Sequence, residues 1–241
     1  MIRIEHLKKH FGDKLVLKNV NLDIHKGETL VIIGQSGCGK TVLLKSIIGL
    51  IQPDGGHIIV DDVDVTKLRR SKLFQFREKF GMLFQNSALF DSMTVKENIG
   101  LALEEHTGLS DKEIEKRVED KLAVVGLSGI GDRMPSELSG GMKKRVGLAR
   151  AIIMDPEFVL FDEPTTGLDP IVADTINDLI IKTSKELGIT SIVVTHDMYS
   201  ASKVGDRIVM LHSGQIVFED TPEKMKKSNH PLVKAFIMSH M

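Results

Sequence analysis

Alternating apolar and polar positions near the N-terminus predict a small antiparallel sheet. Val20, Leu22 and Ile24 are separated by single polar residues, which is the period of a strand buried on one face. Glycine-containing pairs at 12–13 and 26–27 are typical of turns and bound this segment on both sides. We therefore expect the chain to begin with antiparallel strands joined by tight turns.

Three continuous apolar runs, at 29–33, 158–161 and 191–195, predict strands that are buried on both faces. A glycine-rich loop and a predicted helix over 41–50 follow the first run, and helical stretches precede the other two. This alternation indicates an α/β core in the outer thirds of the chain. Near the C-terminus, two short apolar segments around Ser213-Gly214 predict a hairpin.

The middle of the chain has the period of helices. Ser110 and Glu113 have the spacing of a capping box, and the apolar residues that follow recur on one face of a helix that Gly126 can end. A second helix is expected over 139–154, stopped by the Asp-Pro pair at 155–156. The middle therefore predicts a helical insertion in the α/β core.

These patterns predict one domain over residues 1–241. Its core is expected to consist of residues 1–85 and 152–241, with the helical subdomain over 86–151. No repeat, low-complexity tract or linker interrupts the sequence.

Composition excludes several classes of protein. Hydrophobic residues make up 41% and charged residues 27% of the 241 residues, and the net charge of −1 lacks the basic excess of a nucleic-acid-binding protein. The single cysteine, Cys38, excludes an internal disulfide. The most apolar stretch, 42–51, is interrupted by Lys45 and is shorter than the ~20 residues of a membrane span. Another chain would have to supply any path through a membrane.

The glycine-rich loop after the first buried strand matches a phosphate-binding pattern, G-x-x-x-x-G-K-[ST]. It consists of Gly34, Gln35, Ser36, Gly37, Cys38, Gly39, Lys40 and Thr41. The glycines allow backbone N–H groups to surround a phosphate, and the following helix adds the positive end of its dipole. Lys40 is expected to reach the β- and γ-phosphates of a nucleotide, and the Thr41 hydroxyl to bind Mg²⁺.

Polar residues also follow the other two buried strands. Asp162 and Glu163 end the second strand, at the edge where open α/β sheets bind ligands. Asp162 is expected to hold Mg²⁺ through water, and Glu163 to act as the general base toward an attacking water. His196 follows the third strand and is expected to contact the γ-phosphate. A solvated turn at 162–163 and a structural histidine are the alternatives.

A second potential anion site lies at Ser139-Gly140-Gly141, which opens the helix expected from 139. A serine N-cap followed by two glycines leaves backbone N–H groups without a side chain in the way. Because the chain already has one phosphate loop, this site is expected to close over a nucleotide held by another copy. A helix that is merely well capped is the alternative.

The order of these motifs resembles that of the nucleotide-binding subunits of ABC transporters over essentially the whole chain. The resemblance rests on the loop at 34–41, Gln85 after an apolar run, and the segments 138–142, 162–163 and 167–169, followed by His196.

The resemblance implies a P-loop NTPase with a RecA-like core, an N-terminal antiparallel β-subdomain and a helical insertion. It implies that Gln85 joins the metal shell and senses a membrane partner, and that Asp169 lies in the loop linking the two sites of a dimer. It also places Phe11 where the family stacks an aromatic ring on adenine; a core phenylalanine is the alternative.

One position departs from the family's common signature, which ends in Gln where this chain has Met142. The Ser139 and Gly141 contacts should survive, because backbone and hydroxyl groups make them. Together with the segment 89–95, the Gly-Gly-Met form resembles the ATPases of Mla-type lipid transporters that are linked to MCE proteins. The resemblance therefore implies ATP and Mg²⁺ as ligands and phospholipid transport as the function.

The implied partners are a second copy of the chain on ATP binding, integral membrane permease subunits and an MCE-type lipid-binding protein, with no nucleic acid. The implied location is cytoplasmic, on the inner face of the cell membrane. Leu89, Phe90 and Met93 are candidates to receive a permease helix, with an ordinary core role as the alternative. Lysine- and arginine-rich clusters at 67–72 and 224–227 could lie near anionic lipid or form solvated faces.

Three other functions stay open at this point. An importer ATPase for a small polar solute would carry the same motifs. A soluble ABC ATPase of translation or DNA repair usually has tandem nucleotide domains or long coiled-coil insertions, for which this chain has no room. A regulator that binds ATP without turnover would not need Glu163.

Overall fold

The computed structural model describes residues 1–239, and these form two compact units. The first unit comprises residues 1–77 and continues from residue 190, and the second comprises residues 78–189. The expected subdomain limits at 86 and 151 both fall inside the second unit and stay a prediction. The last two residues of the expected domain, 240–241, lie outside the described part of the chain.

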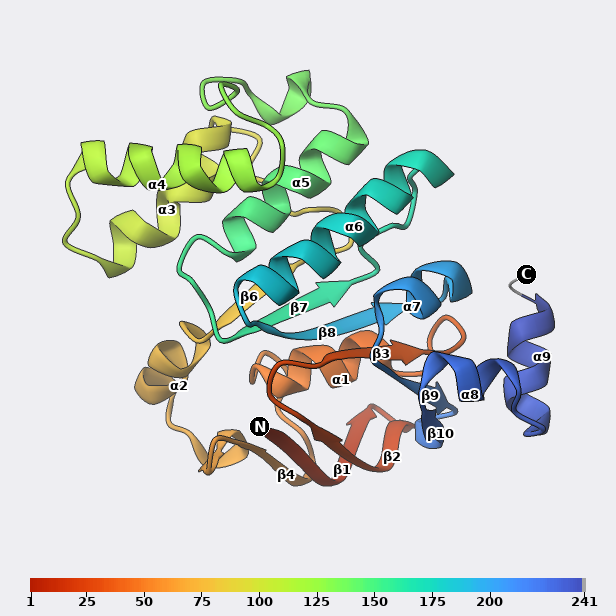
Figure 1. The fold of residues 1–241 in the computed structure, drawn as a ribbon. Helices are drawn as coiled ribbons and strands as arrows, with labels where there is room; N and C mark the ends of the chain where they lie inside the picture. The colour runs from red at the N-terminus through yellow and green to blue at the C-terminus, as the bar shows by residue number, and fades with distance from the viewer. Residues whose placement is uncertain (240–241) are drawn as a thin grey trace. The chain divides into compact units, whose positions relative to one another are not determined.

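The first unit begins with an antiparallel sheet whose strands lie in the order β2-β1-β4-β5 (Figure 1). Its strands are β1 (Ile2–Phe11), β2 (Lys14–Ile24), β4 (Gly55–Val60) and β5 (Val63–Asp64). Buried and exposed residues alternate along the end of β2, where Val20, Leu22 and Ile24 are all buried. The expected N-terminal antiparallel sheet is thus confirmed.

The same unit contains the strands β10, β9, β3 and β8, side by side in this order. They span β3 (Thr29–Ile33), β8 (Thr190–Thr195), β9 (Arg207–His212) and β10 (Gln215–Asp220). β3 is parallel to both β8 and β9, whereas β10 is antiparallel to β9. Every residue of β3 and β8 is buried, as their uninterrupted apolar sequences predict.

The helices of the first unit connect or follow these strands. They are α1 (Lys40–Ile47), the 3₁₀ turn η1 (Val65–Lys67), α2 (Arg70–Arg77), α7 (Met198–Val204), α8 (Pro222–Lys226) and α9 (Pro231–Ser239). α1 ends three residues before the expected position 50, because Gly49 takes a left-handed conformation (φ 64°) just after the C-cap. The expected β9–β10 hairpin is confirmed, with left-handed residues at 213 and 214.

The second unit consists of a parallel strand pair and several helices. Its elements are β6 (Phe80–Leu83), α3 (Val95–His106), α4 (Asp111–Val124), η2 (Pro135–Glu137), α5 (Gly140–Ala151), β7 (Phe158–Asp162) and α6 (Pro170–Glu186). The helices α3, α4 and α5 pack on one another (Figure 1). The capping box at Ser110 and Glu113 is present. α5 is shorter than the expected 139–154, because Ile152 caps it (φ −105°, ψ 7°).

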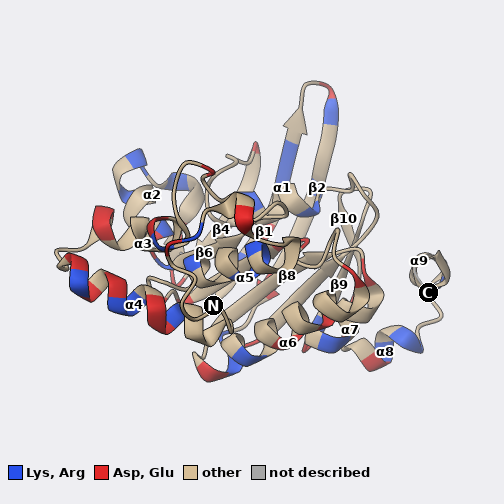
Figure 2. Ribbon diagram, turned by 90° about the horizontal axis from the view of Figure 1, so that it is seen from above, with Lys and Arg blue, Asp and Glu red and all other residues tan. Residues whose placement is uncertain are grey.

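Basic and acidic residues alternate along the ribbon of α4, as Figure 2 shows. Some of the expected basic clusters are also locally neutralised, because Lys67 pairs with Asp64 at 2.9 Å and Lys224 with Asp220 at 2.9 Å. These contacts favour the solvated-face interpretation of those lysines. No helix within residues 1–239 combines the length and apolar character that crossing a membrane requires.

A close backbone approach holds β6 against α5. A Cβ on Gly81 would lie 1.9 Å from the carbonyl oxygen of Ala151, so only glycine fits at this point of the strand. The rings of Phe80 and Phe158 stack at 4.8 Å on the neighbouring strands. β6 and β7 end at the same level, because Leu83 pairs with Phe161, and the chain beyond each end carries predicted site residues.

We expect Gly81→Ala to lower the free energy of unfolding by about 1–3 kcal/mol, because the methyl group would force strand and helix apart. Gly108→Ala is the matched control, since no atom lies within 4 Å of a Cβ there. Urea denaturation of both variants measures the difference. Equal stabilities for the two variants would show that the Gly81–Ala151 contact does not constrain the strand.

Candidate functional site

The phosphate-binding loop connects the end of β3 to the start of α1 and has a backbone that requires glycine. A Cβ on Gly34 (φ 155°) would lie 2.2 Å from the carbonyl oxygen of Leu211, and Gly37 and Gly39 have φ values of 75° and 110°. Gly39 is the N-cap of α1 and offers no side-chain acceptor to the first turn. This helix start therefore suits an anionic ligand.

The ammonium group of Lys40 is held inside the curve of this loop. The residue is only 6% exposed, and its Nζ donates hydrogen bonds to the carbonyl oxygens of Gly34 at 2.8 Å and Gln35 at 3.2 Å. A compact positive charge enclosed by a glycine loop matches the chemistry of phosphate binding. The structure thus places Lys40 in the loop as its sequence spacing predicts.

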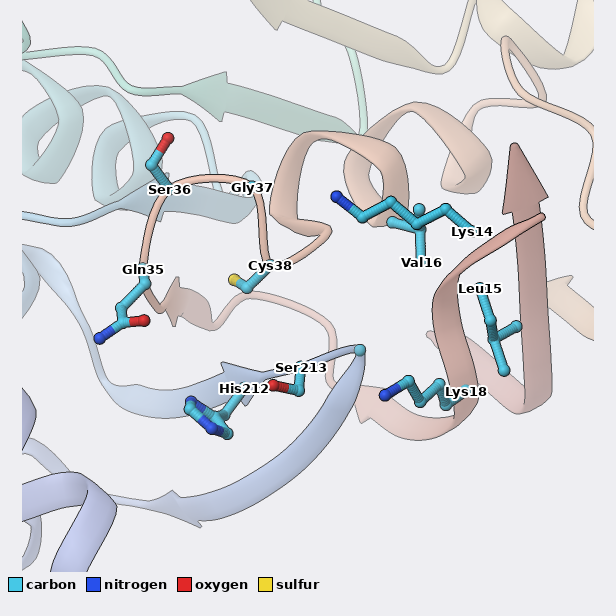
Figure 3. A pocket seen from close by; sticks show the side chains of 11 residues that line it. Lys14, Leu15, Val16, Lys18, Gln35, Ser36, Gly37, Cys38, His212 and Ser213 are labelled. Carbon is cyan, nitrogen blue, oxygen red and sulfur yellow. The ribbon is translucent and has the colours of Figure 1, made fainter. Parts of the chain in front are cut away.

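A cavity of about 270 Å³ lies beside the phosphate loop within the first unit. Figure 3 shows the loop residues 35–38 on one side and the β9–β10 hairpin at His212 and Ser213 on another, with Lys14 and Lys18 of β2 completing it. Two lysines next to a phosphate loop make the opening electropositive, so the cavity suits the rest of a phosphorylated ligand.

Phe11 lies at the end of β1 and is 49% exposed, so it is not a core residue. The ammonium of Lys9 lies 5.4 Å from the centre of its ring, a distance at which a cation and a π system attract each other. Phe11 is not among the residues that line the loop cavity. Its exposed ring leaves the expected stacking on adenine as a prediction.

His196 and the phosphate loop leave neighbouring strands at the same level. Ile33, the last residue of β3, pairs with Thr195, the last residue of β8. Because these strands are parallel, Gly34 and His196 both follow carboxyl ends at one sheet edge. His196 is exposed, and Asp197 after it caps α7 by accepting hydrogen bonds from backbone N–H groups. The first unit thus brings together the loop and the histidine.

The second unit has an equivalent arrangement at the ends of β6 and β7. Leu83 pairs with Phe161 in these parallel strands, so Gln85 and the acidic pair Asp162-Glu163 follow adjacent carboxyl ends. Asp162 is 5% and Glu163 9% exposed, whereas Gln85 is exposed. Carboxylate and amide oxygens that follow adjacent strand ends are suitable ligands for a hard cation.

The backbone and side chain of Glu163 are both constrained. Glu163 has a left-handed backbone (φ 50°), which is uncommon for a residue other than glycine and is found mostly where the surroundings hold it in place. The Thr166 hydroxyl donates a hydrogen bond to Glu163 Oε2 at 3.1 Å. The carboxylate that the sequence assigns as the base is therefore oriented by a neighbour that the sequence analysis did not identify.

Lys144, on α5, is a second residue that the sequence analysis missed. Its Nζ donates hydrogen bonds to the backbone carbonyl oxygens of Gln85 at 2.5 Å and Glu163 at 3.2 Å, and the residue is only 4% exposed. Burial lowers the pKa of its ammonium group, and the carboxylates of Glu163 and Asp162 oppose that shift. The available signal was a lysine at helical spacing from buried Gly141, on the face of α5 that packs inward.

Ser139 is the N-cap of α5, and its Oγ accepts a hydrogen bond from the backbone N–H of Met142 at 3.3 Å. Ser139 and Gly140 are exposed, as a surface that faces a second molecule requires. A Cβ on Gly141 would lie 2.5 Å from a methyl group of Val172, so this glycine permits close packing of α5 on α6. The capped helix is confirmed, and the second anion site stays a prediction.

Asp169 is the N-cap of α6, where its Oδ1 accepts hydrogen bonds from the backbone N–H groups of Ile171 and Val172. Its implied role between the two sites of a dimer stays a prediction. The predicted site residues as a whole divide between the units. Residues 11, 34–41 and 196 belong to the first, and residues 85, 139–141, 162–163 and 169 to the second.

Comparison with known proteins identifies the family. A family model described as ABC transporter matches residues 17–166. The intermembrane phospholipid transport system ATP-binding protein MlaF of Haemophilus influenzae is 40% identical over 98% of this chain and 90% of its own length. The probable ribonucleotide transport ATP-binding protein mkl of Mycobacterium tuberculosis is 41% identical over 98% of this chain, which spans 66% of that relative.

Solved structures show the same fold. A dimeric bacterial ABC transporter cassette superimposes with a TM-score of 0.86 at 34% identity, covering 92% of this chain and 99% of that one. An ABC transporter subunit of Clostridium perfringens, cbiO1, gives a TM-score of 0.85 at 30% identity, covering 100% and 98%. The predicted fold class is thus confirmed, and the chain belongs to the ABC transporter family as one of its ATP-hydrolysing cassettes.

Proposed function

We propose that two copies of this chain enclose two molecules of Mg·ATP and that hydrolysis drives lipid transport through a separate membrane permease. The observation that carries the nucleotide assignment is the glycine loop with the buried Lys40 ammonium directed at its carbonyl oxygens. A polyphosphate would replace these carbonyl oxygens as the partner of the ammonium group. The first turn of α1 adds backbone N–H groups to the same anion.

The side chains that we assign to Mg²⁺ carry the kinds of oxygen atom that this ion takes. Thr41 supplies a hydroxyl, Asp162 a carboxylate and Gln85 an amide oxygen, and Mg²⁺ typically takes one or two carboxylates together with phosphate and water oxygens. Within residues 1–239, no group of three or more His, Cys, Asp and Glu side chains is placed to hold a metal ion. When bound, Mg²⁺ would neutralise charge on the phosphates.

Glu163 is the residue that we assign as general base. Its carboxylate accepts the proton of a water molecule as the water oxygen forms a bond to the terminal phosphorus and the bond from that phosphorus to the ADP oxygen breaks. Lys40 stays paired with the phosphate oxygens throughout. His196 donates a hydrogen bond to the terminal phosphate, and Phe11 stacks on adenine.

The second copy contributes its helix start at Ser139, Gly140 and Gly141. Solved relatives support this arrangement, because one dimeric cassette with 34% identity to this chain is a post-hydrolysis state bound to ADP and phosphate. In the proposed dimer, the Ser139 hydroxyl and the N–H groups of α5 face the phosphates held by the partner copy. The phosphates of ATP then attract both copies and stabilise the dimer. Hydrolysis weakens this attraction.

The cargo that we favour is phospholipid. The MlaF relative, 40% identical over nearly the full length of both chains, carries phospholipid transport in its name. The proposed partners are permease subunits, which hold the chain on the inner face of the membrane, and an MCE-type lipid-binding protein. Methionine import ATP-binding proteins are 39–42% identical and keep small-solute import as the alternative.

We expect Lys40→Ala to lose most ATP binding, because it removes the ammonium group that the phosphate loop encloses, whereas Glu163→Gln keeps binding. Turnover in Glu163→Gln should fall about a hundredfold, the typical loss on removing a general base. Calorimetric titration with ATP and an assay of released phosphate measure the two effects. Turnover at the wild-type rate in Glu163→Gln would show that another group accepts the proton.

A second expected effect concerns the carboxylate's neighbour. Thr166→Val removes the hydrogen bond to Glu163 Oε2 and should lower kcat about three- to tenfold, in line with the net ~0.5–1.5 kcal/mol of a typical hydrogen bond. Thr175→Val is the control, since that hydroxyl donates to Ile171 within α6. If both variants keep the wild-type kcat, the Thr166 bond does not orient the base.

The cargo assignment has its own test. The complete transporter, placed in vesicles with fluorescent phospholipid or with labelled methionine, should move phospholipid between membranes only with ATP and wild-type Glu163. ATP-dependent uptake of methionine without lipid movement would establish the importer alternative.

A further inference from the structure

The ammonium group of Lys144 connects two segments that carry the proposed chemistry. It donates to the backbone carbonyl oxygen of Gln85, after β6, and to that of Glu163, after β7. These segments are far apart in sequence, and α5, which carries Lys144, is a third element. The ammonium group therefore links α5 to the segments that follow β6 and β7.

Burying a charged side chain at position 144 costs desolvation free energy. The residue is 4% exposed, and the buried residues on the same helix are otherwise glycine, alanine, valine and leucine. An apolar side chain would avoid the desolvation penalty, which two carbonyl oxygens and the nearby carboxylates of Asp162 and Glu163 offset. A lysine at this position is explained if its hydrogen bonds position the backbone at Gln85 and Glu163.

The hydrogen bond from Lys144 to the Glu163 carbonyl positions the turn that carries the base. Glu163 has a left-handed backbone, so the direction of its carbonyl and of its carboxylate depends on what holds that turn. Lys144 holds the carbonyl, and Thr166 holds the carboxylate. Hydrogen bonds thus hold both the backbone and the side chain of Glu163. The lysine that holds the backbone also holds the Gln85 segment.

We propose that Lys144 is a positioning residue that couples the Gln85 segment to Glu163, so that the base is aligned only when that segment is in place. The inference rests on the proposed function, in which Gln85 joins the metal shell and Glu163 accepts the proton. Since Ser139 is the N-cap of α5, the helix that we propose to face the second copy also carries the coupling group. Movement of the Gln85 segment or of α5 would then change turnover without changing the loop that binds ATP.

The experiment compares Lys144 with Arg150, a matched cation on the same helix. Arg150 donates to the carbonyl oxygens of Ala88 at 2.7 Å and Ser87 at 2.6 Å, so it anchors the same segment without contacting Glu163. The variants are Lys144→Met, Lys144→Arg and Arg150→Met in the full chain. For each, kcat and KM for Mg·ATP are measured, together with the unfolding temperature with and without ATP.

We expect kcat to fall about tenfold or more in Lys144→Met, with KM changed less than about threefold, since alignment acts on the reaction and not on ATP binding. The increase in unfolding temperature on adding ATP should persist. Lys144→Arg should recover at least half of the lost kcat, because a guanidinium can donate to both carbonyls. Arg150→Met should lower the unfolding temperature and lower kcat by less than Lys144→Met does, because Lys144 still joins the Gln85 segment to Glu163 in that variant.

Other outcomes would overturn the inference. Equal losses of kcat in Lys144→Met and Arg150→Met would assign both residues to anchoring alone, and a KM that rises in proportion to the loss would assign Lys144 to nucleotide binding. If Lys144→Met does not fold, Lys144→Gln replaces it, and a wild-type kcat there contradicts the coupling. A wild-type chain that neither binds nor hydrolyses ATP would instead contradict the proposed function, and the inference with it.

Discussion

The close contact between Gly34 and the carbonyl oxygen of Leu211 constrains the nucleotide-binding half of this protein. A Cβ at position 34 would lie 2.2 Å from that oxygen, which no side chain tolerates. β9 supplies the oxygen and pairs with β3 in parallel, so the pairing of two strands sets the starting direction of the phosphate loop. The position of the Lys40 ammonium follows, because its hydrogen-bond acceptors are the carbonyls of Gly34 and Gln35.

The polar groups of both units depend on parallel strands that end at the same level. In the first unit the register of β3 and β8 places the loop and His196 after paired residues, and in the second that of β6 and β7 does the same for Gln85 and Glu163. Fully buried strands cannot carry these groups along their length, because unpaired polar side chains are costly there. The chemistry therefore gathers at strand ends, where the chain turns toward solvent.

Much of this arrangement could be predicted from the sequence because it depends on local rules. Apolar runs predicted the buried strands, the glycine pattern predicted the loop, and the caps at Ser110 and Ser139 predicted helix starts. The contacts of Lys144 and Thr166 could not be predicted in the same way. Lys144 meets carbonyls 59 and 19 residues away, and such contacts depend on how α5 packs, which hydrophobic periodicity does not specify.

Helix ends were also harder to predict than helix starts. α1 and α5 both stop before the expected residue. Gly49, just after the C-cap of α1, was an available signal for a helix end, whereas the C-cap Ile152 of α5 is an apolar residue without such a signal. An N-cap uses a side chain that can be recognised in the sequence, whereas these C-terminal ends are made by backbone hydrogen bonds. The left-handed backbone of Glu163 was not predicted either, because a glutamate side chain gives no sequence signal for that conformation.

The central claim is that each nucleotide lies between the phosphate loop of one copy and the Ser139 helix start of the other. Two variants of the Glu163→Gln protein test it most directly, one with Lys40→Ala and one with Ser139→Arg. Either variant alone has a defect in both sites of a dimer, but a mixed dimer has one intact site and one site with both defects. Sedimentation with Mg·ATP should therefore show dimers in the mixture and only monomers for each variant alone. A mixture that stays monomeric, while Glu163→Gln alone dimerises with ATP, would contradict a site shared between copies.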